Sequence, residues 1–136
     1  MKIYYREKSG GIEILRCFGI EGRVEIPGMI ENKLVISAAP YAFSSHMDEK
    51  EDLKNASLWE VSDGLEFGRE EHVLAGNDVE EIVFPDTLKE IGRYIFYGCG
   101  NLKKLEFSDS LMQIGCGAFT GCHALEKLTI HMRQGK

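Results

Sequence analysis

Apolar positions in the second half of the chain recur with a period of 23 residues. Between residues 79 and 130, most apolar, glycine and cysteine positions of one unit hold the same or a similar residue 23 positions later. The matched sets are Val79, Leu102 and Leu125; Ile82, Leu105 and Leu128; Phe84, Phe107 and Ile130; Leu88 and Leu111; Ile91 and Ile114; Gly92 and Gly115; Phe96 and Phe119; Gly98 and Gly121; Cys99 and Cys122. Matches of this breadth indicate an internal structural repeat.

Within one unit the spacing of apolar residues changes along the chain. Residues 105–107 (Leu-Glu-Phe) alternate with period two, which is typical of a strand with one buried face. A turn is expected at 108–110, where the preceding unit has Pro-Asp-Thr, and Gly92 or Gly115 then allows a bend. The apolar spacing within 118–122 favours a short helical turn. Repetition of such a unit predicts a solenoid in which each coil adds one parallel strand.

These units resemble the BspA-type leucine-rich repeat of many bacterial proteins. The residues that carry the resemblance are Phe84-Pro85-Asp86, Leu88, Ile91-Gly92, Phe96, Cys99 and Leu102, and, in a longer first unit, Ile26-Pro27, Ile30, Val35 and Tyr41-Ala42-Phe43. The resemblance implies a short right-handed leucine-rich-repeat solenoid of the α/β class with a parallel β-sheet. Two alternating strands around a Gly-Gly turn at the start of the chain predict an N-terminal β-hairpin cap.

On this reading residues 1–136 form a single leucine-rich-repeat domain of six segments. They are the hairpin cap 1–22, the first long repeat 23–43, an acidic insert plus degenerate repeat 44–78, the regular repeats 79–101 and 102–124, and the partial repeat 125–136. The degenerate repeat is expected because Phe43 and Phe96 lie two repeat lengths plus seven residues apart. Its core positions are expected to be Val61, Leu65, Phe67 and Val73.

The net charge of −6 is distributed unevenly. Residues 44–78 hold ten acidic and three basic residues, a net charge of −7, so the remaining residues sum to +1. Nucleic-acid binding is not expected, because no dense basic stripe is visible. Membrane insertion is not expected either, because no apolar segment approaches the length of a membrane span. The lack of a signal-peptide core predicts a cytoplasmic location with free thiols, and the cell surface is the alternative.

The repeated Gly- and Cys-containing segments, residues 91–102 and 114–125, could be sites of chemistry. Cys99 and Cys122 stand in matching positions, which indicates small core residues, because stacked side chains run parallel and do not converge as a disulfide requires. A metal site would recruit Cys116, Cys122, His123 and His131, but no paired C-x-x-C spacing supports one. The glycine spacing is not that of a dinucleotide-binding loop, and no histidine stands in a pattern that activates a nucleophile. We therefore expect no catalytic residue, cofactor or metal.

Two surfaces are candidates for binding a protein partner. By the resemblance, the first is the outward face of the parallel sheet, for which a plain solvated surface is the alternative. Its side chains are expected in two columns. These columns are Glu81, Lys104 and Lys127, and Val83, Glu106 and Thr129, with Glu81 and Lys104 as a cross-strand charge pair. The second surface is an amphipathic helix predicted within residues 46–61, which carries Trp59, a residue type enriched at binding hot spots. The alternative for this helix is that it lies back on the solenoid.

The last predicted strand is followed by no polar capping segment in the repeat pattern. Leu125, Leu128 and Ile130 are therefore expected to leave an apolar edge, which a homodimer, another partner or a continuation of the repeat could cover. We predict a non-enzymatic protein–protein interaction module with a protein partner. The alternatives are a structural or self-assembling domain that acts through the C-terminal edge, and a cell-surface module of the adhesin type.

Overall fold

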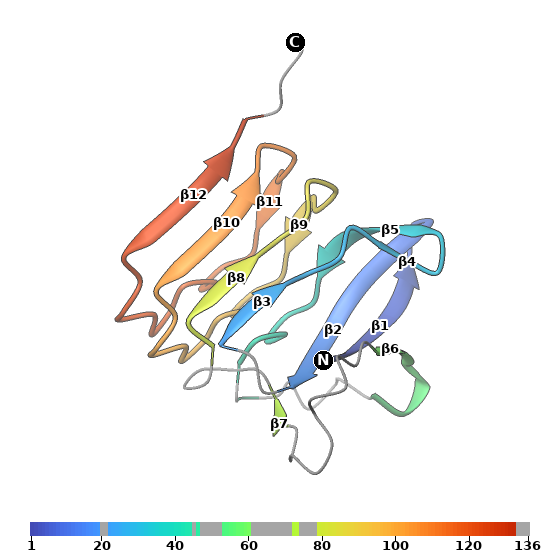
Figure 1. Cartoon of the computed structure of the whole chain (residues 1–136), viewed down its shortest axis with the longest axis horizontal. Helices are drawn as coiled ribbons and strands as arrows, with labels where there is room; N and C mark the ends of the chain where they lie inside the picture. Colours follow the sequence, from blue (N-terminus) through green and yellow to red (C-terminus); the bar gives the residue numbers. More distant parts are fainter. Residues whose placement is uncertain (20–21, 45, 47–52, 61–71, 74–78, 133–136) are drawn as a thin grey trace.

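The computed structural model describes residues 1–19, 22–44, 46, 53–60, 72–73 and 79–132 (Figure 1). Within these ranges the chain forms twelve strands and one short 3₁₀ helix, η1 (Leu53–Asn55). The strands join into a four-stranded sheet and an eight-stranded sheet.

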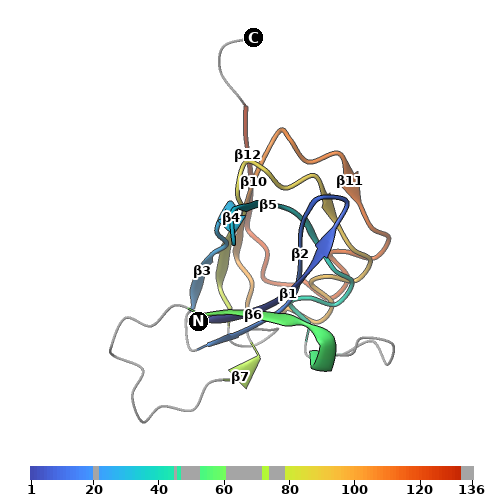
Figure 2. The same cartoon turned by 90° about the vertical axis from the view of Figure 1, so that its right-hand side faces the viewer.

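The four-stranded sheet is one continuous wall of the solenoid. Its spatial order is β3 (Arg23–Glu25), β8 (Glu81–Val83), β10 (Lys104–Ser108) and β12 (Lys127–His131), and all neighbours are parallel. A second parallel row, within the eight-stranded sheet, consists of β5 (Lys33–Ala38), β9 (Glu90–Ile91) and β11 (Gln113–Ile114). Figure 2 looks along the stack and shows each coil passing from the first row to the second. The predicted solenoid of stacked parallel strands is confirmed.

The first coil lies directly against the second. We call residues 23–43 coil 1, 79–101 coil 2, 102–124 coil 3 and 125–131 the partial coil 4. Strand β3 pairs with β8 and β5 pairs with β9, so coils 1 and 2 are neighbours in both rows. This pairing leaves no place in the stack for the degenerate repeat predicted between them. Of its expected core positions, Val61, Leu65 and Phe67 lie outside the described residues, and Val73 belongs to a strand outside the coils.

The segment between coils 1 and 2 pairs with the N-terminal hairpin instead. Strand β6 (Ser57–Glu60) is antiparallel to β1 (Lys2–Lys8), and β7 (His72–Val73) is antiparallel to β2 (Gly11–Gly19). Over residues 53–60 the predicted amphipathic helix is therefore wrong, since η1 and β6 occupy that stretch. The edge of β1 offers main-chain hydrogen-bond partners, and these favour a strand over a short isolated helix.

A buried arginine holds the beginning of this segment against β2. Arg16 is 4% exposed, and its guanidinium donates hydrogen bonds to the carbonyl oxygens of Ser44 and His46. A buried guanidinium needs such acceptors, because an unsatisfied buried charge is strongly destabilising. Arg16 thus fixes the direction in which the chain leaves coil 1.

The N-terminal hairpin has a two-residue turn. Ser9 and Gly10 have φ values of +51° and +82°, the left-handed combination that suits a tight antiparallel hairpin. The turn is therefore Ser-Gly, one residue earlier than the predicted Gly-Gly turn. Strand β2 runs parallel to β5, and β4 (Met29–Ile30) forms a short antiparallel ladder with β5. The role of the hairpin as a cap stays a prediction.

No α-helix occurs among the described residues, so the predicted α/β class finds no support there. The expected helical turns of coils 2 and 3 are separate turns, as in the bond from Cys99 N to Phe96 O. In coil 2, other amide groups of the turn bond to coil 3: Tyr94 N donates to Cys116 O and Phe96 N donates to Ala118 O. A helix would use these donors internally, so stacking and helix formation compete for the same groups.

Columns of like side chains fill the interior of the stack. Phe96 is fully buried, and its ring centroid lies 6.1 Å from that of Phe43 in coil 1 and 5.8 Å from that of Phe119 in coil 3. The thiols follow the same pattern, since Cys99 Sγ donates to Phe43 O at 3.1 Å and Cys122 Sγ to Phe96 O at 3.4 Å. Cys99 belongs to the buried core cluster and Cys122 packs against it, which confirms the core-ladder interpretation. Burial raises the pKa of Cys122, which keeps this thiol protonated as a donor.

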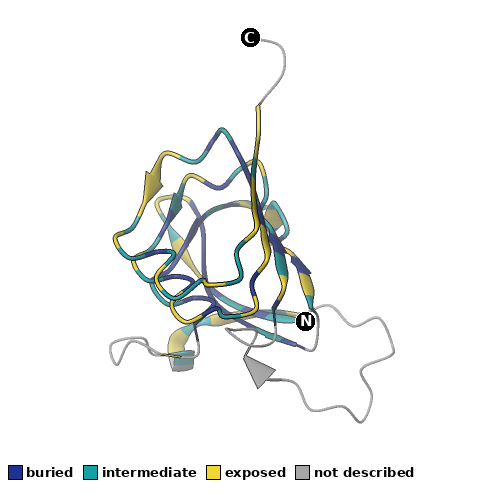
Figure 3. Cartoon of the chain, turned by 90° about the vertical axis from the view of Figure 1, so that its left-hand side faces the viewer, coloured by how far each residue is buried: buried dark blue, intermediate teal, exposed yellow. Residues whose placement is uncertain are grey.

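The last coil exposes apolar side chains, as the sequence predicted. Ile82 and Leu105 are at most 1% exposed, but Leu128, the next member of their column, is 49% exposed. Ile130 is exposed to a similar degree, and Leu125 is half-buried. Among the described strands, β12 pairs only with β10, so its other edge is open. Figure 3 shows the exposed positions at this end of the stack.

Candidate functional site

The outward face of the four-stranded sheet carries the predicted columns. Strand pairing places Lys104 between Glu81 and Lys127. In the same way it places Glu106 between Val83 and Thr129. The six predicted residues therefore form two rows across β8, β10 and β12. Identical spacing in each repeat sets this register, which is why the sequence could predict it.

Strand β3 extends both rows by one residue that the sequence pattern had not revealed. Arg23 lies opposite Glu81, and Glu25 lies opposite Val83. The signal was present in the dipeptides Ile26-Pro27 and Phe84-Pro85, which directly follow β3 and β8 and are equivalent in this register. The expectation of an intervening repeat hid it.

Ion pairs organise the charges of this face. Arg23 Nε lies 3.2 Å from Glu81 Oε2, and Arg23 Nη1 lies 2.6 Å from Glu25 Oε1. These hydrogen bonds, that to Glu25 first, raise the pKa of Arg23. The predicted pair of Glu81 with Lys104 is not formed, because Glu81 reaches Arg23 instead.

A shallow pocket of about 300 Å³ opens where the chain enters the strands of this face. Its lining residues are Gly22, Arg23, Glu80, Glu81, Lys103 and Lys104. Lys103 Nζ lies 3.3 Å from Glu80 Oε1 across it. The carbonyl oxygen of Gly22 accepts from two amides of the next coil, at 2.8 Å and 3.1 Å, so the pocket floor is held by main-chain bonds.

Trp59 lies away from this face. It stands in β6, opposite Ile3 of β1, and its partly buried side chain packs against the core. Trp59 therefore lies back on the fold, as the alternative prediction for this segment had it, although in a strand and not in a helix. Among the described residues, the sheet face brings its six predicted residues together, whereas Trp59 packs against the core.

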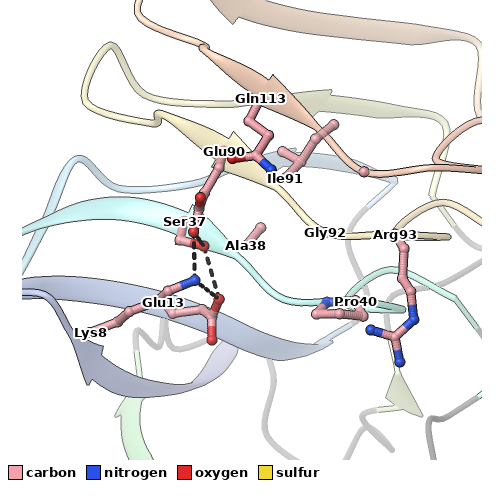
Figure 4. A pocket seen from close by; sticks show the side chains of 11 residues that line it. Lys8, Glu13, Ser37, Ala38, Pro40, Glu90, Ile91, Gly92, Arg93 and Gln113 are labelled. Carbon is pink, nitrogen blue, oxygen red and sulfur yellow. Dashed lines mark hydrogen bonds and ion pairs between the residues drawn. The ribbon is translucent and has the colours of Figure 1, made fainter.

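A second polar pocket lies on the eight-stranded sheet (Figure 4). It has a volume of about 260 Å³, and a row of paired residues crosses it: Glu13, Ser37, Glu90 and Gln113. Glu13 is 3% exposed, and its carboxylate is bound by Arg6, Lys8 and Ser37. Glu13 belongs to the hairpin, Ser37 to coil 1 and Glu90 to coil 2. Because the Ser37 hydroxyl lies within hydrogen-bond distance of both carboxylates, the cluster links the hairpin to both coils.

Lys8 connects the two carboxylates of this cluster. Its Nζ lies 2.5 Å from Glu90 Oε1 and 3.2 Å from Glu13 Oε2. The hydrogen bond to Glu90 is the main cause that raises the pKa of Lys8, and the same bond lowers the pKa of Glu90.

We expect the Lys8–Glu90 pair to make stability depend on pH in the acidic range. Because the pKa of Glu90 is lowered by folding, its contribution is complete above the ordinary carboxyl value of 4.5 and is lost as the pH falls through the lowered value. Both groups are partly exposed, so the contribution is below about 1 kcal/mol. Urea midpoints of the wild type and Glu90→Gln should differ at pH 7 and converge toward pH 3. A difference that stays constant over this range would contradict the assignment.

The remaining sequence candidates do not assemble. Among the described residues no three His, Cys, Asp or Glu side chains are grouped closely enough to hold a metal ion. This covers Cys116, Cys122, His123 and His131, and the last of these contacts Glu106 at 3.1 Å. No helix in the described part of the chain has the length and apolar character needed to cross a membrane.

The fold is a solenoid of stacked parallel strands, and comparison with known proteins specifies its type. Residues 70–134 match the family described as BspA type leucine rich repeat region (6 copies). These residues are therefore a BspA-type leucine-rich repeat region, which confirms the resemblance found in the sequence. A comparison with curated proteins gives no match.

Two solved structures are similar to this chain. A leucine-rich cell surface protein from Faecalibacterium prausnitzii is 21% identical, with a TM-score of 0.60 over 93% of this chain and 30% of its own. The chain thus spans about a third of the length of that protein. A leucine-rich repeat protein from T. pallidum is 15% identical, with a TM-score of 0.48 over 95% of this chain and 83% of its own. At 21% identity the likeness to the F. prausnitzii protein shows the fold alone.

Proposed function

We propose that the chain is a non-enzymatic protein-interaction module that binds its partner on the outward face of the four-stranded sheet. The observation that carries the proposal is the set of outward side chains held in register over four strands, from β3 to β12. Such a surface presents several side chains at fixed spacing without any loop having to order on binding.

Site-specific photo-crosslinking tests this proposal. We expect a photoreactive amino acid in place of Val83, at the centre of the face, to capture one identified protein from the source organism. The same amino acid in place of Gln113, on the other sheet, is the matched control and should not capture it. The captured protein, once purified, should bind the wild-type chain. Equal capture at both positions, or capture of many proteins without preference, would refute the proposal.

A second proposal is self-association through the C-terminal end of the stack. Leu128 and Ile130 stand exposed beside the open edge of β12, which favours pairing with the same edge of a second copy. The opposite end buries its apolar residues, such as Val24 and Ile30, so an end-to-end dimer related by a twofold axis fits better than an open filament.

Light scattering distinguishes this second proposal. The wild type should be dimeric at high micromolar concentration, and Leu128→Glu should be monomeric. Leu34→Glu is the matched control, because Leu34 is 47% exposed but lies on β5, away from that end. A monomeric wild type would rule the dimer out.

A cell-surface setting is the third proposal. Its support is the description of the F. prausnitzii protein as a cell surface protein, together with the shared fold. Labelling of intact cells with a membrane-impermeant amine reagent should then modify the exposed lysines of this chain. Labelling only after cell lysis would favour the cytoplasmic location expected from the sequence.

A further inference from the structure

Main-chain hydrogen bonds join the turns of successive coils. In these bonds an amide of one coil donates to a carbonyl oxygen of the next coil: Tyr94 N to Cys116 O at 3.0 Å, Phe96 N to Ala118 O at 3.1 Å and Gly98 N to Thr120 O at 3.0 Å. Coil 1 donates to coil 2 in the same way. The equivalent amides of coil 3 belong to Gly117, Phe119 and Gly121, and within the described ranges none of the three has an acceptor. We call these three amides the donor row.

The second parallel row ends with acceptors instead of donors. Here the later coil donates to the earlier one: Met112 N donates to Lys89 O at 2.7 Å, and Gly115 N donates to Ile91 O at 2.9 Å. In coil 3 the oxygens equivalent to these acceptors are Met112 O and Ile114 O. No described residue donates to either oxygen. We call these two oxygens the acceptor pair.

The two sets of groups limit what can cover this end of the stack. An occupant that covers the exposed Leu128 and Ile130 also takes water away from the main-chain groups beside them. Buried amides without acceptors are destabilising, so the occupant has to supply carbonyl oxygens to the donor row and donors to the acceptor pair. The same end of a second copy carries both kinds of group.

A twofold axis through β12 brings these groups together. When β12 pairs with its own copy in one sheet, the axis is perpendicular to the sheet and reverses the strand direction. The chain leaves the carboxyl end of each strand of the four-stranded sheet to reach the second row, and it returns from the turn to the amino end of the next strand (Figure 2). The reversal therefore lays the acceptor pair of each copy against the donor row of the other.

A head-to-tail arrangement lacks this match. The donor row would then need the carbonyl oxygens of the coil 1 turn in the next copy. One of these, Ser44 O, already accepts from the buried guanidinium of Arg16, and β2 covers the edge of β5 at that end. The twofold arrangement leaves both contacts in place.

The alternation of side chains within β12 selects the register. Residues directly opposite in an antiparallel pair lie on the same face, so a slip by one residue would turn Leu128 and Ile130 out of the interior. A register centred on Thr129 pairs all five residues of β12 and sets Leu128 opposite Ile130 of the second copy. Lys127 then lies opposite His131 of the second copy.

Resting on the self-association proposed above, we infer that two copies join through antiparallel β12 strands centred on Thr129, with the acceptor pair of each copy against the donor row of the other. The two four-stranded sheets become one continuous sheet. Leu128 and Ile130, exposed in the single chain, become interior residues.

Disulfide formation between introduced cysteines tests the register. Every variant also carries Cys116→Ser, because Cys116 is an exposed thiol. The two copies of residue 129 would lie about 5 Å apart between Cα atoms, within disulfide range, so Thr129→Cys should form a covalent dimer with oxidised glutathione. The two copies of residue 127 would lie about 14 Å apart, so Lys127→Cys should give about tenfold less covalent dimer. Lys127 is more exposed than Thr129, so chance collisions would produce the opposite order.

A mixture of two variants provides a second measurement. Lys127→Cys and His131→Cys should crosslink with each other, because the inferred register sets these positions opposite. Adding Leu128→Glu to Thr129→Cys should abolish the covalent dimer, whereas adding Leu34→Glu should not. Hydrogen exchange of the Gly117 and Phe119 amides should slow about tenfold between the monomeric and dimeric concentration ranges, because these donors gain acceptors.

The outcomes separate this inference from the self-association on which it rests. A wild type that is dimeric by light scattering but gives no preferential Thr129→Cys crosslink, or no slower exchange in the donor row, overturns the inference and keeps the dimer. A monomeric wild type at high micromolar concentration removes the dimer itself.

Discussion

Replacement of Gly92 by alanine is expected to lower the free energy of unfolding by about 3 kcal/mol or more. A Cβ atom on Gly92 would lie 2.3 Å from the nitrogen of Pro40 and 2.7 Å from the carbonyl carbon of Ala39. Both are main-chain atoms of coil 1, and they cannot move aside without separating the coils. Domains of this size are stable by about 5–15 kcal/mol, so the loss is a large fraction of the total.

The matched control for this substitution is Gly22→Ala. The nearest atom to a Cβ on Gly22 is Glu80 Oε2, at 3.6 Å, which belongs to a flexible side chain. We expect a change within about 0.5 kcal/mol there. Urea denaturation followed by circular dichroism measures both variants, and similar midpoints for the two would contradict the close coil contact.

The close contact between coils also explains why glycine recurs at positions 92 and 115, and this explanation differs from the one expected from the sequence. The sequence suggested that Gly92 and Gly115 allow a bend, but neither is among the residues with positive φ. A Cβ on Gly115 would lie 2.3 Å from the nitrogen of Arg93, just as one on Gly92 meets Pro40. The repeat therefore places glycine where the main chains of successive coils touch. Sequence periodicity located these positions, but only the stacking of coils shows what they do.

Periodicity also explains which parts of the candidate site could be predicted. The columns that contain Lys104 and Glu106 follow from one repeat length applied twice, because parallel strands in register keep equivalent residues adjacent. Arg23 was missed because the spacing from proline to phenylalanine is 16 residues in coil 1 (Pro27 to Phe43) and 11 in coil 2 (Pro85 to Phe96), so counting back from the phenylalanines in units of 23 residues placed an extra coil beside it. A register that depends on a loop of unequal length cannot be read from the period of the regular repeats.

The parts that lie outside the repeat were harder to predict. Trp59 pairs with β1, and Glu13 pairs across to Ser37 of β5; both contacts join segments that share no repeat pattern. The apolar residues Met47, Leu53, Leu58 and Trp59 suggested one side of an amphipathic helix, and over residues 57–60 pairing with the edge of β1 decided in favour of a strand. Tertiary pairing of this kind overrides local preference, because it satisfies a whole row of main-chain groups at once.

Phe96→Ala is expected to cost about 3–5 kcal/mol, the range for truncating a fully buried phenylalanine. Its ring is enclosed on both sides of the stack, with Phe43 on one side and Phe119 on the other, and it also contacts Phe84 at 6.1 Å. Removal of the ring leaves a cavity that these neighbours cannot fill without shifting whole coils. The urea midpoint and its slope measure the loss.

Phe119→Ala provides the matched comparison, because Phe119 occupies the same position of the repeat one coil later. Its side chain is only partly buried, since no described coil covers it on the far side. We therefore expect a smaller loss of about 1–2 kcal/mol. The sequence alone predicts equal costs for the two substitutions, whereas the structure predicts unequal ones. Equal losses would mean that Phe119 is covered as fully as Phe96, and the end of the stack that follows coil 3 would then be closed in solution.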